Sequence, residues 1–171
     1  YLVLDPAIQD SAPTTHSFRL VPTAGSEVAV ALNTTVEGTI SLPGQSVRHS
    51  FTLAAPTRVF MDALAPADGN WQWTLTGPRG QVDARAFTSS DSRDTSVAPL
   101  YDLPAGTYVL TVAPRNGATG DFSFALLDAA QAAPITLGTT QSDQFAPGSE
   151  TKLYSFAGEA GGRYFFDVVT G

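Results

Sequence analysis

Hydrophobic and polar positions alternate along short stretches of this chain, and Gly, Pro, Asn or Asp residues separate the stretches. Residues 34–41 (TTVEGTIS) show the two-residue period of a half-buried strand, whereas residues 57–64 (TRVFMDAL) are apolar on both sides, as in a central strand. The pattern predicts eight short strands, over residues 34–41, 46–54, 57–64, 70–77, 81–88, 98–103, 107–114 and 121–128. Short strands with turns at this spacing indicate an all-β, antiparallel β-sandwich.

One hydrophobic core is expected inside this sandwich. Its predicted members are Phe51, Phe60, Trp73, Leu75, Tyr108, Val112, Phe122 and Phe124. Trp71 and Trp73 alternate on one face, so they are either packing residues or, if that face is exposed, an aromatic platform for a carbohydrate. Leu75 lies on the same face and favours packing.

The chain repeats part of its own sequence at a distance of about 105 residues. HSFTLAAPTRVFMDA (49–63) shares Ser-Phe, Arg, Phe and Asp at corresponding positions with YSFAGEAGGRYFFDV (154–168). LNTTVEGTISLPG (32–44) matches LGTTQSDQFAPG (137–148) when one residue of slack is allowed. Arg58 therefore corresponds to Arg163 in the second copy. Each is either a side chain packed on the sandwich edge or a contact between domains.

A period of this length is the size of an independent domain, far longer than one solenoid repeat. We therefore predict that residues 1–30 are the end of a preceding β-sandwich repeat, that residues 31–130 form a complete unit, and that residues 131–171 begin a following repeat. On this hypothesis the chain is an internal piece of a tandem array. A duplicated element inside one domain is the alternative.

The order of the sequence pieces adds a resemblance to a known family. The pieces are GTISLPGQSVRHSFTL (38–53), WTLTGPRG (73–80), LPAGTYVLTV (103–112) and FSFALLD (122–128). Together they resemble the bacterial pre-peptidase C-terminal (PPC) domain, a jelly-roll-like sandwich found beside secreted proteases and in long, repeat-containing surface proteins. The resemblance covers nearly all of the complete unit. It implies a non-catalytic module at the surface of, or outside, a bacterial cell, without identifying a ligand.

Charge and composition exclude several classes of function. The 171 residues carry 9 Lys and Arg against 16 Asp and Glu, a net charge of −7, which disfavours nucleic-acid binding. There is no Cys, hence no disulfide scaffold or thiolate site, and no apolar run approaches the ~20 residues of a membrane span. With only two His residues and neither a G-x-S-x-G nor an H-E-x-x-H motif, we predict that the chain is not an enzyme.

One group of oxygen ligands is a candidate calcium site. Asp62 ends an apolar strand, and Asp68 and Asn70 follow in the adjacent turn. PPC relatives often carry a D-x-D sequence at this turn, and Asp68-Gly69-Asn70 departs from it. Calcium prefers such carboxylate and carbonyl oxygens. The alternative is that Asp62 accepts hydrogen bonds from its own loop or pairs with an Arg, because a carboxylate there needs a partner. No other cofactor is expected, and residues 89–96 (SSDSRDTS) are interpreted as a solvated loop.

Two functions fit these observations. The first is a structural spacer, filament or adhesive segment of a large bacterial surface or secreted protein. The second is an accessory carbohydrate- or protein-binding module attached to a secreted hydrolase. Exposed Trp71 and Trp73 would favour the second function, and buried ones the first. The expected partners are neighbouring repeats of the same chain, or other copies that add a strand to the open edges of the partial units.

Overall fold

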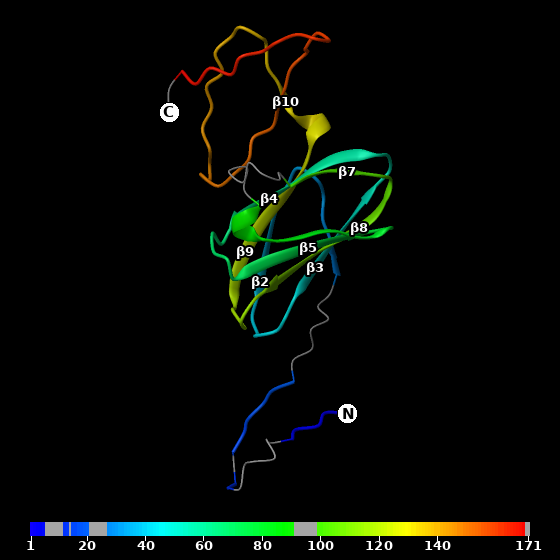
Figure 1. The fold of residues 1–171 in the computed structure, drawn as a ribbon, viewed down its shortest axis with the longest axis vertical. Helices are drawn as coiled ribbons and strands as arrows, with labels where there is room; N and C mark the ends of the chain where they lie inside the picture. The colour runs from blue at the N-terminus through cyan, green and yellow to red at the C-terminus, as the bar shows by residue number, and fades with distance from the viewer. Residues whose placement is uncertain (6–11, 14, 21–26, 91–98, 170–171) are drawn as a thin grey trace.

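The computed structural model describes residues 1–5, 12–13, 15–20, 27–90 and 99–169. Two sheets pack face to face as a β-sandwich (Figure 1). The five-stranded sheet has the order β1 (Glu27–Ala29), β3 (Val47–Leu53), β8 (Gly106–Pro114), β5 (Trp71–Gly77) and β6 (Gly80–Ala86). The four-stranded sheet has the order β2 (Thr35–Ile40), β9 (Gly120–Asp128), β4 (Thr57–Ala65) and β7 (Leu100–Leu103).

The prediction of an all-β sandwich is confirmed, and each of the eight predicted strands is present as β2 to β9. The sequence pattern missed β1, whose three residues are too few to show a period. Because β1 runs parallel to β3, the five-stranded sheet is mixed, whereas a purely antiparallel sheet was predicted. Two short 3-10 helices, η1 (Phe87–Ser89) and η2 (Ala129–Gln131), follow β6 and β9.

The inner faces of the two sheets enclose one hydrophobic cluster that contains seven of the eight predicted core residues. Phe60 is the exception: it is buried but lies outside the cluster, because its neighbours Val59 and Met61 occupy the inward positions of β4. Trp71 and Trp73 are both buried, so the packing interpretation is right and these two residues do not form an exposed aromatic platform. Trp73 Nε1 donates to Ser90 Oγ at 2.6 Å, which satisfies the indole inside the core.

Two glycines let aromatic rings lie directly on the backbone. A Cβ on Gly38 would stand 2.3 Å from Phe122 Cζ, and a Cβ on Gly77 would stand 2.3 Å from Tyr108 Cε1. The Tyr108 hydroxyl in turn donates to the Pro104 carbonyl oxygen at 2.8 Å. An Ala at either position would collide with the ring and push it away from the backbone.

The flanking segments do not form the strands expected of partial units. Described residues 1–5, 12–13 and 15–20 contain no strand, although the end of a preceding sandwich repeat was predicted there. Between residues 139 and 169, where the start of a following repeat was predicted, only β11 (Tyr154–Ser155) forms, and it pairs with β10 (Ala133–Pro134). In the sandwich, β2 pairs with β9 and β3 pairs with β8. Residues 133–169 contain no equivalent of β8 or β9.

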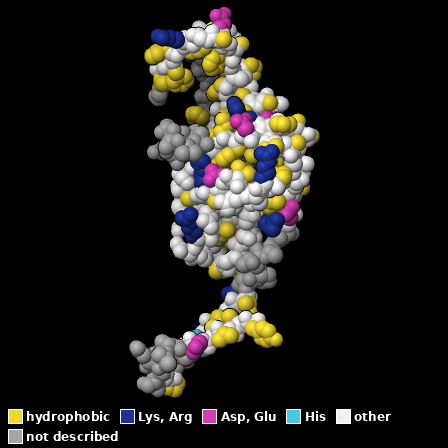
Figure 2. All heavy atoms as spheres, turned by 45° about the vertical axis from the view of Figure 1, so that its right-hand side comes forward, with side chains coloured by type: hydrophobic (Ala, Val, Ile, Leu, Met, Phe, Trp, Pro, Cys, Tyr) yellow, Lys and Arg dark blue, Asp and Glu magenta, His cyan; other side chains and the backbone are white. Residues whose placement is uncertain are grey.

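The two flanks lie beyond opposite ends of the sandwich (Figure 1). Hydrophobic side chains are exposed on the C-terminal segment, which is at the top of the molecule in Figure 2. No helix within the described parts of the chain is long and apolar enough to cross a membrane.

Candidate functional site

The predicted calcium ligand Asp62 is buried and bound by a distant part of the chain. Thr151 donates twice to its carboxylate, from the backbone N–H to Oδ2 and from the hydroxyl to Oδ1, each at 2.9 Å. Donors from the same loop or from an Arg were the alternative predicted from the sequence, and nothing in the sequence pattern connects Asp62 with a residue so far along the chain. These two bonds stabilise a carboxylate that would be costly to bury alone.

The other two candidate ligands lie in the exposed turn between β4 and β5. The Asn70 backbone N–H donates to Asp68 Oδ1 at 2.8 Å, which is a local turn contact. Across the described residues, no group of three or more His, Cys, Asp or Glu side chains is arranged to hold a metal ion. A calcium site at Asp62, Asp68 and Asn70 stays a prediction. The polar loop 89–96 lies mostly outside the described residues.

His49 is a buried ring inside the sandwich. It makes edge-on contacts with Phe122 and Phe124, with ring centroids 5.8 and 5.1 Å away. Neither ring nitrogen has a hydrogen-bond partner among the described residues, and burial lowers the pKa of the imidazole from its ordinary value. The ring is therefore neutral at pH 7, and its burial against two aromatic rings does not suit a general base that must reach a substrate.

A second polar cluster, which was not predicted from the sequence, joins the two sheets. The Tyr101 hydroxyl of β7 donates to Asp83 Oδ2 of β6 at 2.5 Å, and Arg85 Nε donates to the same oxygen at 2.7 Å. Burial alone would raise the pKa of Asp83, but these bonds and the Ala84 N–H lower it. Burial and the bond to Asp83 raise the pKa of the Tyr101 hydroxyl. The alternation of Asp83 and Arg85 on one strand face was the only available signal.

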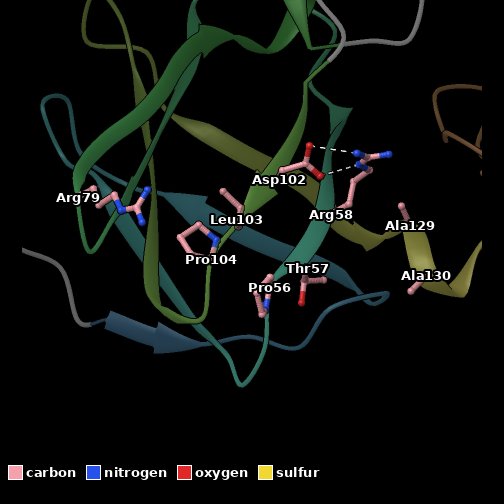
Figure 3. Close-up of a pocket in the computed structure, with 9 residues that line it drawn as sticks. All are labelled: Pro56, Thr57, Arg58, Arg79, Asp102, Leu103, Pro104, Ala129 and Ala130. Atoms are coloured by element: carbon pink, nitrogen blue, oxygen red, sulfur yellow. Dashed lines mark hydrogen bonds and ion pairs between the residues drawn. The ribbon is translucent and has the colours of Figure 1, made fainter.

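One open depression of about 600 Å³ lies beside the edge strand β7 (Figure 3). Arg58 and Asp102 form a bidentate pair at its rim, with Nε–Oδ1 and Nη2–Oδ2 distances of 2.7 and 3.1 Å. The hydrogen bond and charge of each partner raise the pKa of Arg58 and lower that of Asp102. The remaining lining residues are Pro56, Thr57, Arg79, Leu103, Pro104, Ala129 and Ala130. Both paired groups are more than half exposed, so the pair is a surface contact that links β4 to β7.

The C-terminal segment repeats backbone contacts of the sandwich at a constant distance of 105 residues. In the parallel pair β1–β3, Val28 lies opposite His49, and in the parallel pair β10–β11, Ala133 lies opposite Tyr154. The next backbone bond also recurs: Val30 N–H donates to Ser50 O, and Ile135 N–H donates to Ser155 O, both at 2.8 Å. The pairing therefore has the same direction and register in both places.

The turns repeat in the same way. Gln45 Oε1 accepts from the Ser41 N–H at 3.0 Å, and Glu150 Oε1 accepts from the Ala146 N–H at 2.9 Å. The Thr34 hydroxyl bonds the Ala31 carbonyl oxygen, as the Thr139 hydroxyl bonds that of Thr136. Asn33 and Gly138 both have a positive φ, of 60° and 78°. These contacts need no shift in register, so the one residue of slack allowed between 32–44 and 137–148 is not needed.

The comparisons with known proteins reach the fold only. No protein-family model matches the sequence, and no curated protein matches it. The structure is similar to the pre-peptidase C-terminal domain of a collagenase from Bacillus anthracis, at 14% identity over 60% of this chain and 96% of that chain, with a TM-score of 0.47. It is also similar to periplasmic inhibitors of g-type lysozyme from two bacteria. For Aeromonas hydrophila the identity is 11% over 60% of this chain and 96% of that one, with a TM-score of 0.45. For Salmonella Typhimurium the identity is 19% over 61% of this chain and 99% of that one, with a TM-score of 0.44. Similarity at this level assigns no activity, ligand or partner to this chain.

Proposed function

We propose that this chain is a non-catalytic β-sandwich module of a larger extracellular bacterial protein, in which consecutive sandwich units form a spacer or adhesive segment. The observation that carries this proposal is the recurrence, 105 residues later, of the β1–β3 pairing and of the turns beside it. Such local contacts, returning at the length of a whole domain, are expected where a second unit of the same kind begins.

Two further observations support a spacer. The flanking segments leave the sandwich at opposite ends, as consecutive units in a linear array would (Figure 1). The aromatic residues that could have formed a binding platform, Trp71 and Trp73, are buried. The extracellular location is supported by the sequence resemblance to PPC domains.

One feature favours the alternative, an accessory ligand-binding module. The depression in Figure 3 is lined by the cationic side chains of Arg58 and Arg79, and the apolar side chains of Leu103 and Pro104 lie between them. It is open, and Arg58 is already paired with Asp102. We therefore rank the binding module second.

The tandem arrangement is tested by the sequence that follows residue 171 in the natural protein. We expect a Trp-x-Trp-x-Leu pattern one period of about 105 residues after Trp71–Leu75, and a Leu-Pro-Ala-Gly-Thr-Tyr pattern one period after residues 103–108. A following sequence without either pattern would contradict the proposal.

The choice between spacer and binding module is tested with the full chain on an array of bacterial and host glycans. The spacer proposal expects no saturable binding. Binding to one glycan class that is lost in Arg79→Ala, but kept in the control Arg115→Ala outside the depression, would replace the spacer by a binding module. Arg115 bonds Gln72 away from the depression and so controls for the loss of one positive charge.

A further inference from the structure

A buried patch lies on the outer face of the four-stranded sheet, away from the core. Along β4, Val59 and Met61 belong to the core cluster. Phe60 and Asp62 alternate with them and therefore point to the outer face of the sheet. Both are nevertheless buried, at 4% and 2% exposure. Ala125, which lies opposite Asp62 on β9, is buried as well. We call Phe60, Asp62 and Ala125 the outer patch.

Thr151 of the C-terminal segment covers the polar centre of the outer patch. It donates one hydrogen bond to each carboxylate oxygen of Asp62, both at 2.9 Å. Bonds to an ionised carboxylate are stronger than bonds between neutral groups. The contact therefore fixes the C-terminal segment to the sandwich at one defined point.

Donor and acceptor positions each occur twice in the sequence, 105 residues apart. The position of Thr151 corresponds to Ser46, another hydroxyl residue, and both follow the repeated turns that end at Gln45 and Glu150. The positions of Phe60 and Asp62 correspond to Phe165 and Asp167. Phe60 is almost fully buried, whereas Phe165 is 89% exposed.

The connection between the two regions is short and anchored. The Asp128 N–H at the end of β9 donates to Asn33 Oδ1 at 2.8 Å, and Asp128 Oδ1 accepts from the Ala130 N–H at 2.9 Å. The chain then enters β10 at Ala133. Because so few residues lie between the anchor and the next unit's first strand, that unit is held close to the outer patch.

We propose that the outer patch is the docking surface for the next unit of the same chain, and that one Thr or Ser of that unit donates both its N–H and its hydroxyl to the buried Asp. This inference rests on the proposed tandem arrangement. The occupant of the equivalent surface around Phe165 and Asp167 is then a further unit, which carries a hydroxyl residue at the position of Ser46 and Thr151.

The test is residue-resolved amide hydrogen exchange on the full chain. In the wild type the residue 151 amide is protected. In Thr151→Val and in Asp62→Asn its exchange becomes about ten- to a hundredfold faster, because one bond to the carboxylate is lost. Thr151→Ser keeps both donors and restores protection. Thr140→Val removes a hydroxyl from an exposed position of the same segment and leaves the residue 151 amide unchanged.

Two results would overturn the docking inference: an unprotected residue 151 amide in the wild type, or exchange that is equally fast in Thr151→Val and Thr140→Val. Since Thr151 lies outside the sandwich, its variants remain informative even if Asp62→Asn fails to fold.

The failure of the tandem arrangement can be distinguished from failure of the docking inference alone. If residue 151 behaves as expected but the natural sequence beyond residue 171 lacks the repeat, the contact is a tie within one domain, and both the tandem arrangement and docking between units are wrong. If the repeat continues but exchange at residue 151 does not respond to Asp62→Asn, only the docking inference is wrong.

Discussion

The start of the sandwich and the C-terminal segment share backbone contacts but differ in burial. The same strand pairing, turn bonds and positive φ recur after 105 residues. Yet Phe51 is 5% exposed and its equivalent Phe156 is 49% exposed. The shared contacts are therefore those that form locally, and burial depends on partners elsewhere in the fold. Turns need only neighbouring residues, whereas burial of the apolar face requires the partners that β8 and β9 provide in the sandwich.

The largest expected effect is the difference between two single variants, Phe51→Ala in the sandwich and Phe156→Ala in the C-terminal segment. Phe51 stacks on Tyr108 in the core, with ring centroids 5.4 Å apart, so Phe51→Ala should lower the free energy of unfolding by about 3–5 kcal/mol. Phe156→Ala should change it by no more than about 0.5 kcal/mol. Urea denaturation followed by Trp fluorescence measures both. Equal losses would show that the C-terminal segment belongs to the same core.

A smaller effect is expected where a ring lies on a glycine. Gly77→Ala places a methyl group 2.3 Å from Tyr108 Cε1 and should cost about 1–3 kcal/mol of unfolding free energy. Gly148→Ala is the matched control in the C-terminal segment, because a Cβ there meets nothing within 4 Å. The comparison fails if both variants have the same urea midpoint.

The burial of His49 should make the free energy of unfolding depend on pH. Burial lowers the folded-state pKa of His49 below its ordinary value of 6.5, so between these two values the unfolded chain binds the proton and the folded chain does not. Stability is therefore highest above pH 6.5 and falls as the pH drops toward the lowered pKa, by at most about 1.4 kcal/mol per pH unit for one proton.

His49→Phe removes the titrating ring, so the slope of unfolding free energy between pH 7 and about pH 5 should flatten whatever its effect on absolute stability. Asp83 does not titrate in this pH range, because its pKa is lowered from 3.8. Its contribution to the free energy of unfolding is lost only in more acidic solution. A wild-type slope that persists in His49→Phe would contradict a neutral, buried His49.

The smallest expected effect concerns calcium. Asp62 and Asp68 already accept hydrogen bonds from Thr151 and Asn70, so EDTA should leave the Tm of the full chain unchanged. A Tm that falls in EDTA and recovers with Ca²⁺ would instead make these two carboxylates ligands.

Much of the sandwich could be predicted from the sequence, for a physical reason. Alternation and turn residues are local signals, and they predicted β2 to β9 and the burial of Trp73 and Tyr108. Phe60 was placed in the wrong layer, because β4 is apolar on both faces and alternation cannot then tell the inside from the outside.

The polar contacts could not be predicted in the same way. Asp62 is 89 positions from Thr151, and Tyr101 is 18 from Asp83, so both contacts depend on how distant segments meet. The repeat in the sequence was visible, but the separate roles of Asp62 and Thr151 within it appear only once the chain is folded.

The central claim, that a complete sandwich is followed by an incomplete copy of its own beginning, is tested most directly by amide hydrogen exchange across the whole chain. We expect amides of β8 and β9, such as those of Leu110 and Phe124, to exchange only through global unfolding. Amides from residue 160 to 169 should exchange with little protection, and residue 151 should stand out as protected within the segment. If residues 133–169 are uniformly as protected as β8 and β9, the segment is an integral part of one larger domain and the account is wrong.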